Sequence, residues 1–155
     1  MEKIPPLESV ATLRKATVAD VPVLLELEKS VSGTRTYSTG LGESGGEEYL
    51  KSNAVYIIEI DNVPVGNISY EIKSDDNAYI SDLVVDPRFQ SRGIARESLT
   101  RVLDELKDYK RIDLVTHPDN KAAIGLYQSL GFVIESRKEN YFGDGEPRLV
   151  LALQK

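Results

Sequence analysis

The sequence predicts a mixed α/β fold in which one sheet is flanked by helices, and two periodicities lead to this expectation. Residues 55–85 hold three consecutive segments of β type, separated by turn residues. Residues 95–106 and 122–130 instead carry apolar side chains at helical spacing, and further short β-type segments lie around them. The expected order is β-α-(α)-β-β-β-α-β-α-β-β, which fits a single mixed sheet with helices packed on it.

The N-terminal part predicts a short strand at residues 13–16 and then a helix. Thr17 and Asp20 are spaced as in a capping box, in which the two residues satisfy each other's backbone donors. Residues 32–46 are rich in Gly, Ser and Thr and predict a long loop, and residues 47–52 predict a short helix.

The central strands are expected at 55–60, 65–72 and 79–85, and in the second of them apolar and polar residues mostly alternate. Asp86-Pro87 ends the third of them. The remaining elements are helix 95–106, strand 112–116, helix 122–130 with Gly131 as its C-terminal cap, and strands 132–135 and 148–153.

Composition narrows the classes of function. A chain of 155 residues with no internal repeat predicts one domain over residues 1–155. It has no cysteine, a single histidine and a net charge of −6, which disfavours thiol chemistry, a histidine-rich zinc site and broad binding to nucleic acid. No secretory signal and no apolar run of 18 residues is present, so we expect a cytoplasmic protein that does not span a membrane. The negative charge suits a cationic substrate such as an amine.

The segment after strand 79–85 predicts an anion site. Gln90-Ser91-Arg92-Gly93-Ile94-Ala95-Arg96 leads directly into a helix whose first amides have no intrahelical partner. Those donors and the helix dipole, together with Arg88, Arg92 and Arg96, suit a pyrophosphate. The alternative is an ordinary turn with one glycine and solvated arginines.

Two segments resemble the GNAT superfamily of N-acetyltransferases. Val84–Ala95 resembles its acetyl-CoA motif, and Asn120–Phe132, about 30 residues later, resembles its second conserved segment. The resemblance implies a mostly antiparallel sheet of six to seven strands with one splayed parallel pair and about four helices. It also implies acetyl-CoA as cofactor, no metal, and a monomer or homodimer.

The resemblance assigns site residues. Tyr127 would protonate the departing thiolate, and Asn120 would contact the cofactor; as alternatives, Tyr127 simply packs and Asn120 caps its helix. The remaining cofactor-binding residues would be Leu83, Val84, Val85, Gln90, Ser91, Arg92, Gly93, Ile94, Ala95 and Arg96.

The proton acceptor is left open among three residues. Tyr79 lies where related enzymes carry a catalytic tyrosine or glutamate, and His117 alone has an ordinary pKa near neutrality. The alternative for His117 is a surface histidine at a strand end. Asp82, also expected near the acceptor, is the third candidate, although strict alternation places it on the opposite face from Tyr79. Val115 stands where ribosomal-protein acetyltransferases have a glutamate.

The acceptor is expected to be a primary amine. The segment Glu139–Gly145 resembles the hairpin with which N-terminal acetyltransferases hold a peptide, with Tyr141 as the hydrogen-bonding residue, so a protein N-terminus is favoured. The alternatives are a small amine such as a polyamine, aminoglycoside or amino acid, a non-catalytic acyl-CoA-binding module, and a serine hydrolase using Ser44 and His117. Gly-rich motifs at residues 40–46 lack the preceding strand that nucleotide or hydrolase sites require.

Overall fold

The computed structural model describes residues 11–31 and 46–155, which form one seven-stranded sheet with the order β1-β2-β3-β4-β5-β7-β6. Only the β4–β5 pair is parallel. The strands are β1 (Thr12–Lys15), β2 (Ala54–Ile60), β3 (Val63–Ser74), β4 (Asn77–Val85), β5 (Arg111–Thr116), β6 (Val133–Lys138) and β7 (Arg148–Gln154). The fold class expected from the sequence is confirmed.

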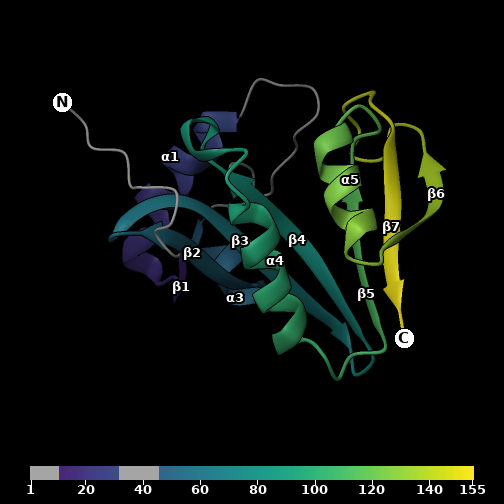
Figure 1. The fold of residues 1–155 in the computed structure, drawn as a ribbon, viewed down its shortest axis with the longest axis horizontal. Helices are drawn as coiled ribbons and strands as arrows, with labels where there is room; N and C mark the ends of the chain where they lie inside the picture. The colour runs from purple at the N-terminus through teal and green to yellow at the C-terminus, as the bar shows by residue number, and fades with distance from the viewer. Residues whose placement is uncertain (1–10, 32–45) are drawn as a thin grey trace.

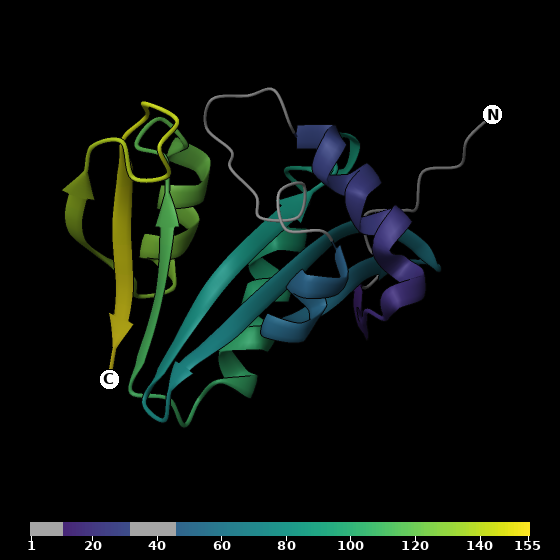
Figure 2. The ribbon, with the colours of Figure 1, turned by 180° about the vertical axis from the view of Figure 1, so that it is seen from behind.

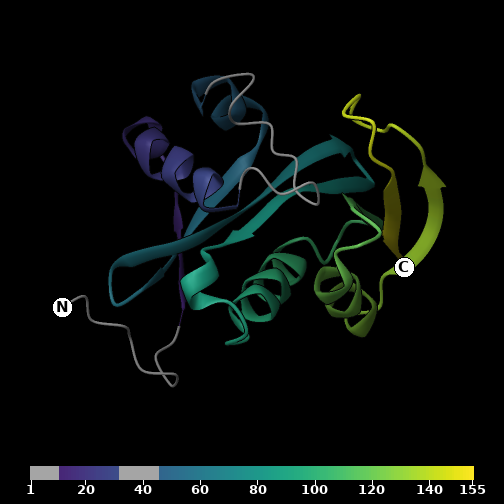
Figure 3. The same cartoon turned by 90° about the horizontal axis from the view of Figure 1, so that it is seen from above.

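Helices cover both faces of the sheet, and the described residues include four α-helices (Figures 1 and 3). One face carries α1 (Val21–Val31) and α3 (Gly46–Ser52), and the other carries α4 (Ile94–Glu105) and α5 (Lys121–Ser129). Short 3-10 turns at Val18–Asp20 and Pro87–Phe89 precede α1 and α4. Within the described ranges, no helix has the length and apolar character needed to cross a bilayer.

Separate apolar clusters hold the two helical layers to the sheet. The larger lies beneath α4 and α5 and includes Ile68, Leu99 and Leu114, each at most 1% exposed. On the other face, Leu24 of α1 and Ile57 of β2 are both fully buried. Neighbouring residues of β2 therefore enter opposite cores, which is why residues 55–60 form a nearly continuous apolar run.

The start of the first helix follows the expected capping pattern. The Asp20 carboxylate accepts a hydrogen bond of 2.8 Å from the Thr17 N–H, and Arg14 donates to both of its oxygens at 3.0 Å. These bonds lower the pKa of Asp20, the arginine contact first. They also tie β1 to the entry of α1.

The sheet is split between its two parallel strands. β4 and β5 pair only at Asn77–Arg111, Ala78–Ile112 and Tyr79–Asp113. Beyond these pairs the strands diverge, as Figure 2 shows. Both strands keep their outer partners, β3 and β7, so their inner edges are left without a partner strand.

A β-bulge in β4 corrects one expectation from the sequence. Tyr79 pairs with Glu71 and Asp82 pairs with Ser69, while the register skips Ser81. Glu71 and Ser69 are two residues apart and share a face, so Tyr79 and Asp82 also share a face. The expectation that they lie on opposite faces is wrong because the bulge inserts one residue between them.

Gly66 provides a stability test for this region. A Cβ at this position would lie 2.2 Å from the Val84 carbonyl oxygen, a backbone atom that cannot move aside. We expect Gly66→Ala to lower the free energy of unfolding by about 2 kcal/mol or more, and Tm by at least about 5 °C.

Gly125 in α5 supplies the matched control, since a Cβ there meets nothing within 4 Å. Gly125→Ala should stabilise the helix by about 1 kcal/mol. Thermal unfolding followed by circular dichroism measures both variants. Equal Tm values for the two would contradict the close approach at Gly66.

Candidate active site

A cavity of about 410 Å³ lies where β4 and β5 separate. Its lining comes from both faces of the sheet, so it passes through the split. The lining residues are Tyr79, Ile80, Ser81, Asp82, Leu83, Val85, Phe89, Gln90, Ser91, Gly93, Ile94, Ala95, Arg96, Leu114, Val115, Thr116, Asn120, Ala122, Ala123, Leu126, Tyr127, Phe142 and Arg148. Most of the site residues predicted from the sequence are among them.

The start of α4 presents free backbone donors to this cavity. The first intrahelical bond runs from the Glu97 N–H to the Gly93 carbonyl at 3.0 Å. Among the described residues, the amides of Gly93, Ile94, Ala95 and Arg96 have no hydrogen-bond acceptor, and no side chain caps the helix. Gly93 has a φ of +79° and Ser91 a φ of +64°, and this left-handed backbone turns the loop into the helix. Such an array of donors at a helix N-terminus suits a pyrophosphate.

Side chains around the loop hold it in place. The Gln90 Nε2 donates to the Val85 carbonyl at 2.9 Å, and the Arg96 guanidinium donates to the Ser129 Oγ of α5 at 2.7 Å. The guanidinium of Arg92 stacks on Phe89 at 5.3 Å. Arg88 pairs with Asp86 at 3.2 Å.

The strand edges supply the second part of a cofactor site. Leu83 and Val85 line the cavity, whereas the Val84 side chain packs against Leu27 and Val31 of α1. Any role of Val84 toward a ligand is therefore limited to its backbone. The unpaired edges of β4 and β5, together with the donors of α4, fit an extended amide chain that ends in a pyrophosphate, as in coenzyme A.

Asn120 and Tyr127 both keep a structural role and both reach the cavity. The Asn120 Oδ1 accepts a hydrogen bond of 3.3 Å from the Ala123 N–H and so caps α5. Tyr127 is 8% exposed and packs on Phe132 with ring centroids 5.9 Å apart. The two interpretations offered for each residue are thus compatible.

Tyr79 and Asp82 line the cavity beside a chain of buried hydroxyls. The Tyr49 hydroxyl of α3 contacts the Ser69 Oγ at 2.5 Å, and the Ser69 Oγ lies 3.2 Å from the Ser81 Oγ. Burial, and then the neighbouring Tyr141 and Asp113, raise the pKa of Tyr79, so this phenol stays protonated at neutral pH. Burial, and then Glu28, raise the pKa of Asp82 to about 7.

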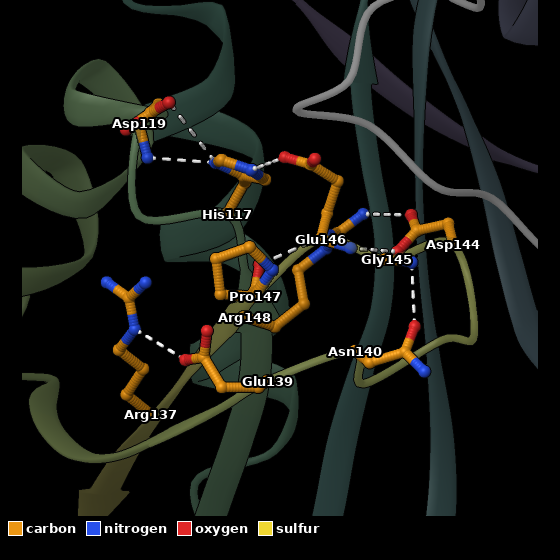
Figure 4. A network of polar contacts seen from close by, with 10 residues as sticks. All are labelled: His117, Asp119, Arg137, Glu139, Asn140, Asp144, Gly145, Glu146, Pro147 and Arg148. Atoms are coloured by element: carbon orange, nitrogen blue, oxygen red, sulfur yellow. Dashed lines mark hydrogen bonds and ion pairs between the residues drawn. The ribbon is translucent and has the colours of Figure 1, made fainter.

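His117 is buried and does not line the cavity (Figure 4). Its Nδ1 accepts a hydrogen bond of 3.0 Å from the Asp119 N–H, so its Nε2 carries the hydrogen and lies 2.7 Å from the Glu146 carboxylate. At 1% exposure it is not the surface residue considered as an alternative. The histidine instead joins the β5–α5 corner to the loop between β6 and β7. Ser44, its partner in the hydrolase hypothesis, lies outside the described residues.

The β6–β7 loop contributes residues that the sequence analysis missed. Arg148 is 1% exposed, pairs with Asp144 at 2.9 Å and lies 5.1 Å from the Phe142 ring centroid. Phe142 and Arg148 line the cavity, whereas Tyr141 does not and is 41% exposed. Tyr141 stacks edge-on against Phe142 and lies close enough to Tyr79 to influence its pKa. Arg148 is the first residue of a strand that is otherwise mostly apolar, and this position is the feature of the sequence that could have indicated its role.

The site geometry and the comparisons define the same class of protein. The model of the acetyltransferase (GNAT) family matches residues 27–132. The chain belongs to this family and binds acetyl-CoA as the donor for acetyl transfer to an amine.

The similar proteins with assigned names include several acetyltransferases. The ribosomal protein bS18-alanine N-acetyltransferase of Salmonella typhimurium is 36% identical, covering 92% of this chain and 96% of that protein. N-alpha-acetyltransferase 30 of Saccharomyces cerevisiae is 29% identical over 59% of this chain and 57% of its own. Among solved structures, a GNAT acetyltransferase from Elizabethkingia anophelis with acetyl-CoA bound has a TM-score of 0.77 at 20% identity, covering 94% of this chain and 98% of its own.

Gly93 provides a test of the donor array. A β-branched residue is strongly disfavoured at its φ of +79°, so Gly93→Val should rotate the amides that open α4. We expect the Kd for coenzyme A, measured by isothermal titration calorimetry, to rise at least tenfold.

Gly143→Val is the matched control. Gly143 has a φ of +81° and open space around it, but lies in the β6–β7 loop. It should suffer similar backbone strain and keep its coenzyme A affinity within about twofold. Equal loss of affinity in both variants would mean that strain alone, and not the donor array, explains the effect.

Proposed function

We propose that this enzyme transfers the acetyl group of acetyl-CoA directly to the α-amine of a protein N-terminus. The observation that carries the proposal is the cavity that passes through the split sheet. The cofactor-binding loop and α4 lie on one face, and Tyr79, Ser81 and Asp82 reach the cavity from the face of α1 and α3. Donor and acceptor can then meet in the split from opposite sides, as direct transfer requires.

The β6–β7 loop supports a peptide as acceptor. Phe142 lines the cavity with the exposed Tyr141 packed edge-on against it, and the His117–Glu146 and Arg148–Asp144 contacts hold the loop that carries them (Figure 4). A fixed loop of this kind can bind an extended chain with little loss of conformational entropy. The similarity to the bS18-alanine N-acetyltransferase and to N-alpha-acetyltransferase 30 supports a protein N-terminus as acceptor. We expect the reaction to take place in the cytoplasm.

One side chain and a set of main-chain amides contribute to the transfer. Tyr127 donates its phenolic hydrogen to the departing sulfur, since its ring is fixed by Phe132 and lies at the cavity wall. Amides at the split and at the start of α4 bind and orient the donor, which supplies the acetyl group as a thioester. In the direct transfer proposed here, the amine attacks the thioester carbonyl itself, and no cysteine acyl-enzyme is involved.

An acceptor panel tests the choice of substrate. We expect a free peptide beginning with alanine to be acetylated at least tenfold faster than either the same peptide with a blocked N-terminus and a free lysine, or spermidine. Coenzyme A release at saturating acetyl-CoA gives the rates, and mass spectrometry locates the acetyl group. Preferential turnover of spermidine would overturn the peptide proposal and leave the acetyltransferase assignment intact.

Tyr127→Phe tests the acid. The ring and its contact with Phe132 remain, so coenzyme A affinity should stay within about twofold, while kcat falls by about 100-fold. Tyr70→Phe is the control, because that hydroxyl instead bonds to Glu105, 2.6 Å away on α4. An unchanged kcat in Tyr127→Phe would remove this residue from the mechanism.

A further inference from the structure

A primary amine in water near neutral pH is mainly an ammonium ion, so acetyl transfer needs a group that takes its first proton. Only a few ionisable side chains at the cavity can serve. His117 lies outside the lining and uses both ring nitrogens, one with Asp119 and one with Glu146. Tyr79 lines the cavity, but its pKa is raised by burial, so it does not ionise near neutral pH.

Asp82, unlike His117 and Tyr79, combines a place in the cavity lining with a carboxylate oxygen that lacks a hydrogen-bond donor. The bulge in β4 turns its side chain to the face of Tyr79 and of the buried hydroxyls, where it lines the cavity. Its Oδ2 is inaccessible to solvent and has no hydrogen-bond partner among the described residues. A buried carboxylate oxygen without a donor is costly, which indicates that a ligand donor completes its environment.

The groups around Asp82 favour proton exchange near neutrality. The ionisable side chains that interact electrostatically with Asp82 are the acids Glu28 of α1, Tyr49 of α3 and Tyr79 of its own strand, and the cation Arg148 of β7 lines the same cavity. Burial and then the Glu28 charge raise the pKa of Asp82 to about 7, against a smaller opposing effect of the Leu83 amide. The Arg148 guanidinium is paired with Asp144 at 2.9 Å, so the Asp82 carboxyl can still accept an ammonium ion as its own ionic partner.

Resting on the proposed function, we infer that Asp82 binds the acceptor ammonium and is the general base of the transfer. Asp82 takes one proton from the ammonium, and the free amine forms the N–C bond as the C–S bond breaks. Tyr127 gives its hydrogen to the sulfur, and the second proton lost by the nitrogen restores Tyr127. Asp82 then releases its proton to solvent, so one amide, one thiol and one free proton result.

Stability gives a readout that needs no substrate. The folded pKa of Asp82 lies above its unfolded value, so ionisation disfavours the folded state, and this penalty develops as pH rises from about 4 to about 7. Asp82→Asn removes the ionisation. Its Tm should exceed that of the wild type by a few degrees at pH 8, and by clearly less at pH 5. Equal differences at both pH values would contradict a buried, ionising Asp82.

The decisive experiment compares pH profiles of kcat/KM for wild type, Asp82→Asn and Glu28→Gln, with the best amine of the acceptor panel and saturating acetyl-CoA. The profile reports groups of the free enzyme and the free amine. We expect kcat/KM of Asp82→Asn to be about 100-fold lower than that of the wild type at pH 7.5. The acidic limb, which is the decrease of kcat/KM toward low pH, should be absent from this variant, and its Kd for coenzyme A should stay within twofold. Glu28→Gln should move this decrease to lower pH, because it lowers the pKa of Asp82. A decrease caused by protonation of the free amine would stay at the same pH in this variant.

Glu71→Gln is the control, since Glu71 pairs across the strands with Tyr79 but lies outside the cavity lining. Its profile should match that of the wild type. An acidic limb retained in Asp82→Asn, or unmoved in Glu28→Gln, would overturn the inference while the acetyltransferase assignment stands. If the wild type turns over no amine in the panel, the proposed function fails instead, and the Tm comparison still decides whether Asp82 ionises as inferred.

Discussion

The short pairing of β4 with β5 is the constraint on which the rest of this structure depends. Three residue pairs join the strands, and beyond Tyr79 and Asp113 each strand keeps only its outer partner. The divergence opens the cavity and exposes backbone groups that an ordinary sheet would use internally. It also lets α4 and α5 present the amides of the 93–96 turn and the Tyr127 ring to the same space. If the β4–β5 pairing continued along both strands, the sheet would be closed and the cavity between these groups would be absent.

The two ends of the cavity differ in electrostatic character, although the chain as a whole carries a charge of −6. At the α4 end, unpaired amides, Arg92 and Arg96 create a positive environment suited to phosphates. At the α1–α3 face, Asp82 and Glu28 create a negative one. The proposed placement of the donor at the first end and the acceptor amine at the second depends on this local arrangement of charge rather than on the net value.

Much of the fold could be predicted because its patterns are local. The helical spacing at residues 95–106 and 122–130, Gly131 with its φ of +100°, and the Asp20 bond to Thr17 all follow from short-range rules. The loop at 90–96 was also predictable, since a strand, a glycine and a helix start occur in sequence. Element ends agree with the expectation or differ from it by at most three residues, as for β3, which runs from Val63 to Ser74.

What could not be predicted arises from long-range contacts. The bulge at Ser81 depends on pairing with β3, so no alternation within residues 79–85 reveals it, and the face of Asp82 was wrongly predicted for that reason. The burial of His117 depends on Glu146, 29 residues away. Likewise, Phe142 and Arg148 reach the cavity because the β6–β7 loop folds back, whereas the sequence motif pointed to Tyr141. More of the residues assigned to the cofactor than of those assigned to the acceptor by the sequence motifs therefore line the cavity.

The unpaired inner edges of β4 and β5 have a consequence for solubility. A free strand edge on a protein surface can recruit the edge of another molecule and start aggregation. Here the two edges face one another inside the domain, too far apart to pair after Tyr79, and helices cover the sheet on both sides. The enzyme can therefore keep reactive main-chain groups available for a ligand without offering them to a neighbouring copy of itself.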